Sequence, residues 1–250
     1  MKIVYSENCI LTDTDKQIAS DLLDSMAAMM TESFGVQPPE FYVSVDPEYK
    51  SPQCCYFQQP AVINLQTPGY DHIQEMYQFG HEFCHLLIGP NKERTTSWLE
   101  ETICELAAQY FMTLQAPFTN FADKISSYLE STNNEVCEVN LANLYDPDSV
   151  LSYCLKHKNQ DREINRFIAL ALMPIAQSFG RDFWRFFQYL HKLPPSLSFS
   201  AAIGSLNAMI CRENDKINTC SASSGISAAI SETFRSVSRA SQSSISSLEG

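Results

Sequence analysis

Residues 71–88, DHIQEMYQFGHEFCHLLI, form the most regular stretch of this 250-residue chain and decide its fold. Apolar residues recur in this stretch at every third or fourth position, which predicts an α-helix with one buried face. Gly89 and Pro90 follow directly, and this pair predicts the end of the helix. The apolar positions are Ile73, Met76, Tyr77, Phe79, Phe83, Leu86 and Leu87.

The same stretch contains the pattern H-E-x-x-H, formed by His81, Glu82 and His85. On a helix, residues four apart lie one turn above each other, so both imidazoles can bind one tetrahedral ion. Glu82 lies beside them, where a general base would act on water. The pattern therefore predicts a metal site of the metallopeptidase type. The alternative is a helical interaction protein in which the three residues fell together by chance.

A second helix, predicted from Trp98 to about Leu114, supplies acidic residues close to this pattern. The connection of residues 89–96 is long enough to return the chain antiparallel, which would bring Glu101 near both histidines as a third ligand. Glu100 competes for this role. Adjacent helical residues point about 100° apart, and the face that Glu101 shares with Glu105 favours Glu101.

Glu105 follows Glu101 by one helical turn. Histidines that bind zinc usually donate their other ring N–H to a carboxylate, and we expect Glu105 to accept that bond. An ordinary solvated glutamate is the alternative interpretation.

H-E-x-x-H followed by Trp98-Leu99-Glu100-Glu101 resembles the gluzincin metallopeptidases, the group of thermolysin and the zinc aminopeptidases. The resemblance implies a zincin-like fold, a zinc ion held by His81, His85 and Glu101, and a peptide or protein substrate. It also implies that Glu82 takes a proton from water made acidic by the metal and passes it to the leaving amine.

The resemblance reaches two further parts of the chain, Ala61–Gln66 and Phe179–Trp184, and the second resembles a glycine-plus-aromatic helix start in the family's helical domain. Ala61–Gln66 occupies the place of the family's edge strand, which pairs with a bound peptide, and Asn64 is its substrate-binding candidate. Relatives add a Tyr or His as a second oxyanion donor. The aminopeptidase tyrosine would fall near Asn165, so Arg166 is the catalytic candidate.

Tyr153 and His157 are the alternatives to Arg166 as oxyanion donor. The exopeptidase pattern G-x-M-x-N does not precede the motif, which favours an endopeptidase or a peptidase of narrow specificity. Because the usual donor is missing, a noncatalytic zinc-binding protein that acts as a binding or regulatory module is the alternative function.

The remaining sequence predicts an α+β protein with a small mixed or antiparallel sheet. Residues 1–115 form the catalytic subdomain, 116–215 a helical subdomain and 216–250 a Ser-rich tail. The tail is expected to be mostly flexible, with one amphipathic helix as the alternative.

Pro60 suggests an edge strand or a bulge. Strands are predicted at 2–5, 41–45, 56–57 and 61–65, and further helices at 14–34, 118–130, 163–192 with interruptions near Pro174 and Gly180, and 198–210.

The composition limits the partners. Asp and Glu outnumber Lys and Arg by 29 to 17, a net charge of −12 that argues against nucleic acid. The best apolar run, residues 167–176, is too short to span a bilayer, and no signal segment is visible. With nine cysteines and no C-x-x-C, we expect reduced thiols and a cytoplasmic location. The oligomeric state is left open.

Overall fold

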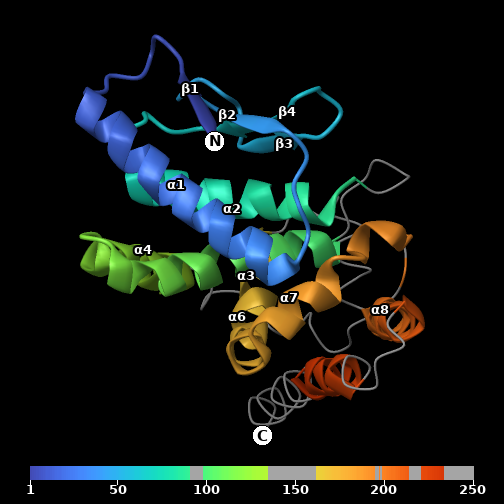
Figure 1. Cartoon of the computed structure of the whole chain (residues 1–250). Helices are drawn as coiled ribbons and strands as arrows, with labels where there is room; N and C mark the ends of the chain where they lie inside the picture. Colours follow the sequence, from blue (N-terminus) through green and yellow to red (C-terminus); the bar gives the residue numbers. More distant parts are fainter. Residues whose placement is uncertain (91–97, 135–161, 195–196, 198, 214–220, 234–250) are drawn as a thin grey trace, which may run out of the picture. The chain divides into compact units, whose positions relative to one another are not determined.

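The computed structural model describes residues 1–90, 98–134, 162–194, 197, 199–213 and 221–233. Within them the chain is an α+β protein with a small mixed sheet, as predicted. The sheet lies on one side of helix α2 (His72–Ile88), and helix α3 (Trp98–Gln115) lies on the other (Figure 1). None of the described helices is both long and apolar enough to span a membrane.

The sheet has the strand order β1-β2-β4-β3. Strands β1 (Lys2–Tyr5), β2 (Phe41–Val45) and β4 (Ala61–Leu65) are parallel, and β3 (Gln53–Cys55) runs antiparallel to β4. Because β4 is paired on both sides and packs against α2, its side chains are almost all buried.

Two predictions for this sheet are wrong. Tyr56 and Phe57 form a turn, and the strand lies immediately before them. The stretch that begins at Ala61 is not an edge, because β3 folds back beside β4 as a hairpin. Pro60 lies in the connection between these strands, where a proline has no ladder hydrogen bond to lose, so it does not mark an edge.

Helix α1 (Asp13–Phe34) connects β1 to β2 and packs against α2. Its start is fixed by a capping box, in which Thr12 Oγ1 accepts from the Asp15 amide and the Asp15 carboxylate accepts from the Thr12 amide. Gly35, with φ of 68°, ends the helix in the left-handed conformation. The predicted helix is confirmed, and α1 buries one face of α2.

Gly80 allows the backbones of α2 and α3 to approach each other closely. A Cβ placed on Gly80 would lie 3.0 Å from Ala108 Cα and 3.3 Å from Met26 Sδ. The first of these neighbours is backbone, so α3 itself would have to move to accommodate a methyl group. Gly80 directly precedes His81, and the close approach therefore sets how near α3 comes to the histidines.

We predict that Gly80→Ala lowers the free energy of unfolding, although alanine is the better helix former. Overpacking costs about 1–3 kcal/mol, which exceeds the gain in helix propensity of about 1 kcal/mol. Gly204→Ala is the matched control, because a Cβ on this exposed helical glycine meets no atom within 4 Å. Chemical denaturation should show opposite signs for the two variants, and equal stabilisation of both would contradict the tight crossing.

The described elements divide into two compact units. The first comprises Met1–Pro90 and Cys104–Thr132, and the second Asn91–Ile103 and Asn133–Gly250. The first unit extends past residue 115 because helix α4 (Ala122–Asn134) contacts α2. The Tyr128 ring lies 5.4 Å from the Tyr77 ring, and the Phe121 ring lies 5.9 Å from the His72 ring. A short 3-10 helix, η1 (Ala116–Phe118), joins α3 to α4.

The described part of the second unit is helical beyond α3, as predicted. It contains α6 (Arg162–Phe179), α7 (Arg181–Phe187), η4 (Leu190–Lys192) and α8 (Phe199–Glu213). The predicted break at Gly180 is confirmed, since this residue has φ of 54°. The predicted interruption near Pro174 is wrong. Helix α6 continues through the proline, and Leu172 and Ala176 on either side of it are fully buried.

The Ser-rich tail is in part ordered. Residues 221–233 are helical, with Ile226 and Ile230 buried and Ser223 Oγ 2.6 Å from Asn207 Oδ1 of α8. The two isoleucines form a buried face, which agrees with the alternative of an amphipathic helix for these residues. Residues 214–220 and 234–250 lie outside the described part of the chain.

The cysteines depart from the prediction at one position. Cys211 is disulfide-bonded, whereas Cys9, Cys54, Cys55, Cys84 and Cys104 are free. The prediction of reduced thiols therefore fails for Cys211.

A buried acid lies in the first turn of α2, six residues before His81. Glu75 is 1% exposed, with its Oε2 3.1 Å from His72 Nδ1 and its Oε1 3.4 Å from Thr67 Oγ1. Burial raises the pKa of Glu75, and the contacts with His72 and Thr67 offset part of this shift. His72 is thus a structural residue and links α2 to Asp15 of α1 at 3.9 Å.

We predict that Glu75 makes the fold less stable as the pH rises. The pKa of Glu75 is higher in the folded chain than its ordinary value of 4.5, so the unfolded chain releases this proton at lower pH. The free energy of unfolding should therefore fall from about pH 4.5 up to the raised pKa, and Glu75→Gln should remove this decline. Denaturation at a series of pH values measures the free energy of unfolding. The same decline with pH in Glu75→Gln as in the wild-type chain would contradict the prediction.

Candidate metal centre

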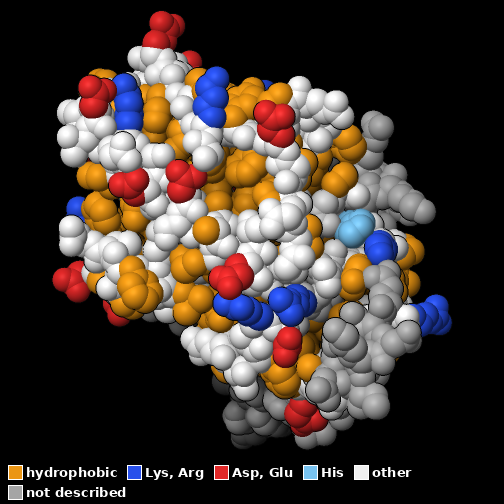
Figure 2. Space-filling view, in the orientation of Figure 1, with side chains coloured by type: hydrophobic (Ala, Val, Ile, Leu, Met, Phe, Trp, Pro, Cys, Tyr) orange, Lys and Arg blue, Asp and Glu red, His pale blue; other side chains and the backbone are white. Residues whose placement is uncertain are grey.

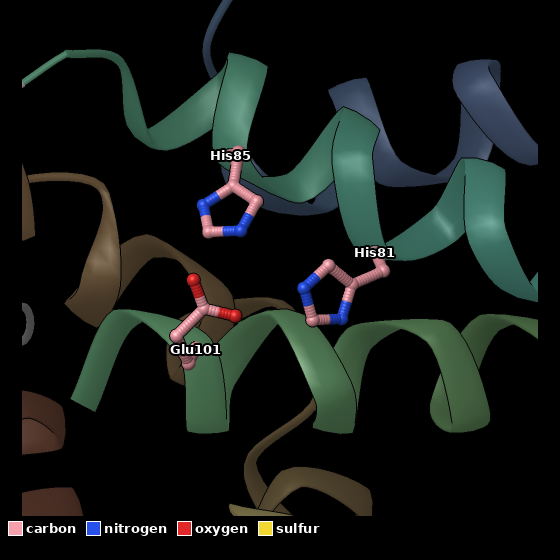
Figure 3. Close-up of side chains that lie close together, drawn as sticks. All are labelled: His81, His85 and Glu101. Carbon is pink, nitrogen blue, oxygen red and sulfur yellow. The ribbon is translucent and has the colours of Figure 1, made fainter. Parts of the chain in front are cut away.

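His81, His85 and Glu101 come together, as their spacing predicted. Their potential ligand atoms all lie within 4.8 Å of one another. Figure 3 shows both imidazoles extending from α2 toward α3, and the Glu101 carboxylate extending from α3 to meet them. Among the described residues this is the one group of at least three His, Cys, Asp or Glu side chains arranged to hold a metal ion.

The dimensions of the group can be compared with those of a bound ion. A tetrahedral zinc ion with bonds of about 2.1 Å separates its ligand atoms by about 3.4 Å. The largest separation in the group is at most 4.8 Å, so binding would draw the ligand atoms together by at most about 1.4 Å, a distance within reach of side-chain rotation. Two imidazoles and one carboxylate also match the donor set of open zinc sites.

Glu101, and not Glu100, faces the histidines. Glu100 is 4% exposed and does not belong to the group. Both residues lie in the first turns of α3, where a difference of one position rotates a side chain by about 100°. The choice between Glu100 and Glu101 is therefore decided by the rotation of α3 about its axis, which turns Glu101 toward the histidines.

Glu105 lies behind His81, as predicted. Its Oε2 is 3.7 Å from His81 Nδ1, and the residue is 4% exposed. The interpretation of Glu105 as a solvated surface glutamate is excluded by this burial. The contact also supports the placement of Glu101, because both glutamates belong to one helix and Glu101 lies one turn earlier.

Two donors to Glu105 were not predicted from the sequence. The Tyr77 hydroxyl donates to Glu105 Oε1, and Gln109 Nε2 donates to the same oxygen at 3.3 Å. A signal for both exists in their spacing, since Tyr77 lies four residues before His81 and Gln109 four residues after Glu105. Each therefore continues a helix face already identified.

Glu82 is 7% exposed and lies close to the edge strand β3. Burial and, second, the nearby Glu82 carboxylate raise the pKa of the Cys55 thiol on this strand. Helix α2, which carries Glu82, contacts β3, and Glu82 is rotated by about 100° from His81 around the helix.

Asn64, the substrate-binding candidate, does not lie on a free edge. It belongs to β4, and its ladder partner on β3 is Gln53. Its amide donates to Cys55 Sγ at 3.7 Å. The edge strands of this described sheet are β1 and β3, and β3 is the edge next to β4, so a peptide that adds to the sheet on this side would pair with β3.

The oxyanion donor is the least defined part of the site. Asn165, near which the aminopeptidase tyrosine would fall, is 4% exposed and accepts a bond of 3.2 Å from Thr102 Oγ1. Its neighbour Arg166, the catalytic candidate, is half-buried on α6. The two alternative donors, Tyr153 and His157, lie outside the described residues.

The charge on the surface agrees with the composition. Figure 2 shows Lys and Arg side chains scattered among acidic ones over the face in view, rather than gathered into a basic patch of the described residues.

Comparisons with protein-family models, with curated proteins and with solved structures gave no match for this chain.

Proposed function

We propose that this protein is a zinc-dependent metallopeptidase with a zincin-like catalytic unit. The single observation that carries the proposal is the convergence of His81, His85 and Glu101 from two helices. Glu82 directly follows His81 on α2, which gives the site a potential base as well as ligands. The mixed sheet, with the antiparallel strand β3 at the edge near Glu82, supports the same assignment.

The choice of zinc rests on the donors and on Glu82. Two histidines and one carboxylate also hold iron(II) in oxygenases, so this set of ligands is compatible with both zinc and iron(II). A buried glutamate beside the ligands suits hydrolysis, in which a base must accept a proton from water. The experiment on metal content must therefore distinguish zinc from iron.

In the proposed reaction Glu82 accepts the proton of the attacking water and later gives it to the leaving amine. When bound, the metal acts as a Lewis acid toward water and the peptide carbonyl. Arg166 is the proposed second donor to the developing oxyanion. Asn64 contributes through Cys55, to which its amide donates, by supporting the edge strand that would receive a peptide or protein substrate. The five free thiols support a cytoplasmic location as part of this proposal, whereas the disulfide at Cys211 counts against it.

One observation favours a noncatalytic zinc-binding protein as the second candidate. Asn165 is buried in a bond with Thr102, so the position expected for a catalytic tyrosine instead holds α6 against α3. In this case the metal would stabilise a surface for binding or regulation.

The proposal is tested on the purified full chain in two steps. Elemental analysis should find one zinc ion per chain, and iron in its place would overturn the zinc assignment. A broad peptide library should then yield cleavage products that disappear with a chelator and return when zinc is restored. Zinc binding without any metal-dependent cleavage would support the noncatalytic alternative.

A further inference from the structure

The two oxygens of the Glu105 carboxylate have different partners. Oxygen Oε1 accepts from the Tyr77 hydroxyl and from Gln109 Nε2, while oxygen Oε2 is the one that faces His81 Nδ1. A carboxylate with two donors on one oxygen is restrained against rotation about its last bond. The two donors therefore determine which oxygen is presented to His81.

Tyr77 is itself held in place by packing. Its side chain is 9% exposed, and its ring contacts the Tyr128 ring of α4 edge-on at 5.4 Å. Tyr77, His81 and His85 lie on successive turns of α2, and Glu101, Glu105 and Gln109 on successive turns of α3. The bond from Tyr77 to Glu105 thus connects the two helices one turn behind the proposed metal ligands.

The orientation of Glu105 matters for metal binding because an imidazole has two nitrogens. A carboxylate that accepts from Nδ1–H fixes the tautomer in which Nε2 is free to bind a metal. In this structure Oε2 lies 3.7 Å from His81 Nδ1, so a hydrogen bond of about 2.9 Å forms after a shift of about 0.8 Å. This shift is similar in size to the distance by which the ligand atoms would move together when an ion binds.

We infer that Tyr77, assisted by Gln109, is a positioning residue of the metal centre. Its hydroxyl holds Glu105 so that Oε2 accepts from His81 Nδ1–H and Nε2 of His81 is directed to the metal. The inference rests on the proposed metal site and assigns a role to a residue outside the H-E-x-x-H motif and the glutamates of α3.

The test is a double-mutant cycle read by zinc affinity. Loss of an outer partner of a ligand typically weakens metal binding by about 10- to 100-fold, and Tyr77→Phe, one bond further out, should fall near the lower figure. Glu105→Gln should weaken binding at least as much. If Tyr77 acts through Glu105, Tyr77→Phe should cost less than about twofold in the Glu105→Gln background.

Tyr49→Phe is the matched control, because it removes a tyrosine hydroxyl bonded to Ser44 in the sheet at 2.7 Å. Its zinc affinity should equal that of the wild-type chain. Wild-type affinity in Tyr77→Phe, or losses that multiply in the double variant, would overturn the inference while leaving the metal site intact. A wild-type chain that binds no zinc would overturn the proposed function itself, and the inference with it.

Discussion

The His85→Ala variant is expected to lose its zinc while it retains its fold. His85 is 6% exposed and provides one of only three proposed ligands. Its loss should weaken zinc binding by more than the roughly 10- to 100-fold that follows from loss of an outer partner. The purified variant should therefore contain far less than one zinc ion per chain by elemental analysis.

Thermal unfolding gives an independent measurement of the same loss. A ligand at a hundred times its Kd stabilises the folded state by about 2.7 kcal/mol, so zinc should raise the Tm of the wild-type chain and leave that of His85→Ala unchanged. His191→Ala is the control. It removes a histidine of η4 that is not among the proposed ligands and whose Nδ1 lies 3.1 Å from Gln188 O. Equal zinc responses in all three proteins would contradict the assignment of His85.

The second large effect is expected for Glu82→Gln, which should abolish hydrolysis and leave zinc bound. A glutamine has nearly the same shape but cannot accept a proton, and loss of a general base typically costs about 10²–10⁴-fold in rate. The measurement is kcat/KM on a peptide selected from the library, together with the zinc content of the variant.

Glu75→Gln is the matched control for Glu82→Gln. It makes the same chemical change at a buried glutamate of the same helix, in a cluster with His72 and Thr67. Its kcat/KM should stay within about twofold of the wild-type value. Full activity in Glu82→Gln would show that a group other than Glu82 accepts the proton, and zinc loss in this variant would show that Glu82 contributes to binding instead.

The candidate centre could be predicted because its residues are spaced by whole turns of two helices. The four-residue spacing of His81 and His85, and of Glu101 and Glu105, fixes each pair on one helix face, and an antiparallel return of the chain brings the faces together. Tyr77 and Gln109 continue the same spacing, yet neither is one of the His, Cys, Asp or Glu side chains that bind zinc, so their role becomes visible only in the contacts with Glu105.

The features that could not be predicted depend on contacts distant in sequence. Strand β3 is short, and its residues show no alternation of polar and apolar side chains, so only its pairing with β4 identifies it. The meaning of Gly80 depends on Ala108, which faces it from another helix. The helix at 221–233 was ambiguous because a weak apolar repeat in a Ser-rich segment is compatible with either state until Ile226 and Ile230 find a surface to cover.

The most direct test of the proposed metal centre is a crystal structure of the zinc-loaded chain, with diffraction measured on both sides of the zinc absorption edge. The predicted result is one anomalous peak at about 2.0–2.2 Å from a nitrogen of His81, a nitrogen of His85 and a carboxylate oxygen of Glu101. A crystal without such a peak, or with a peak that Glu101 does not reach, would contradict the proposed centre.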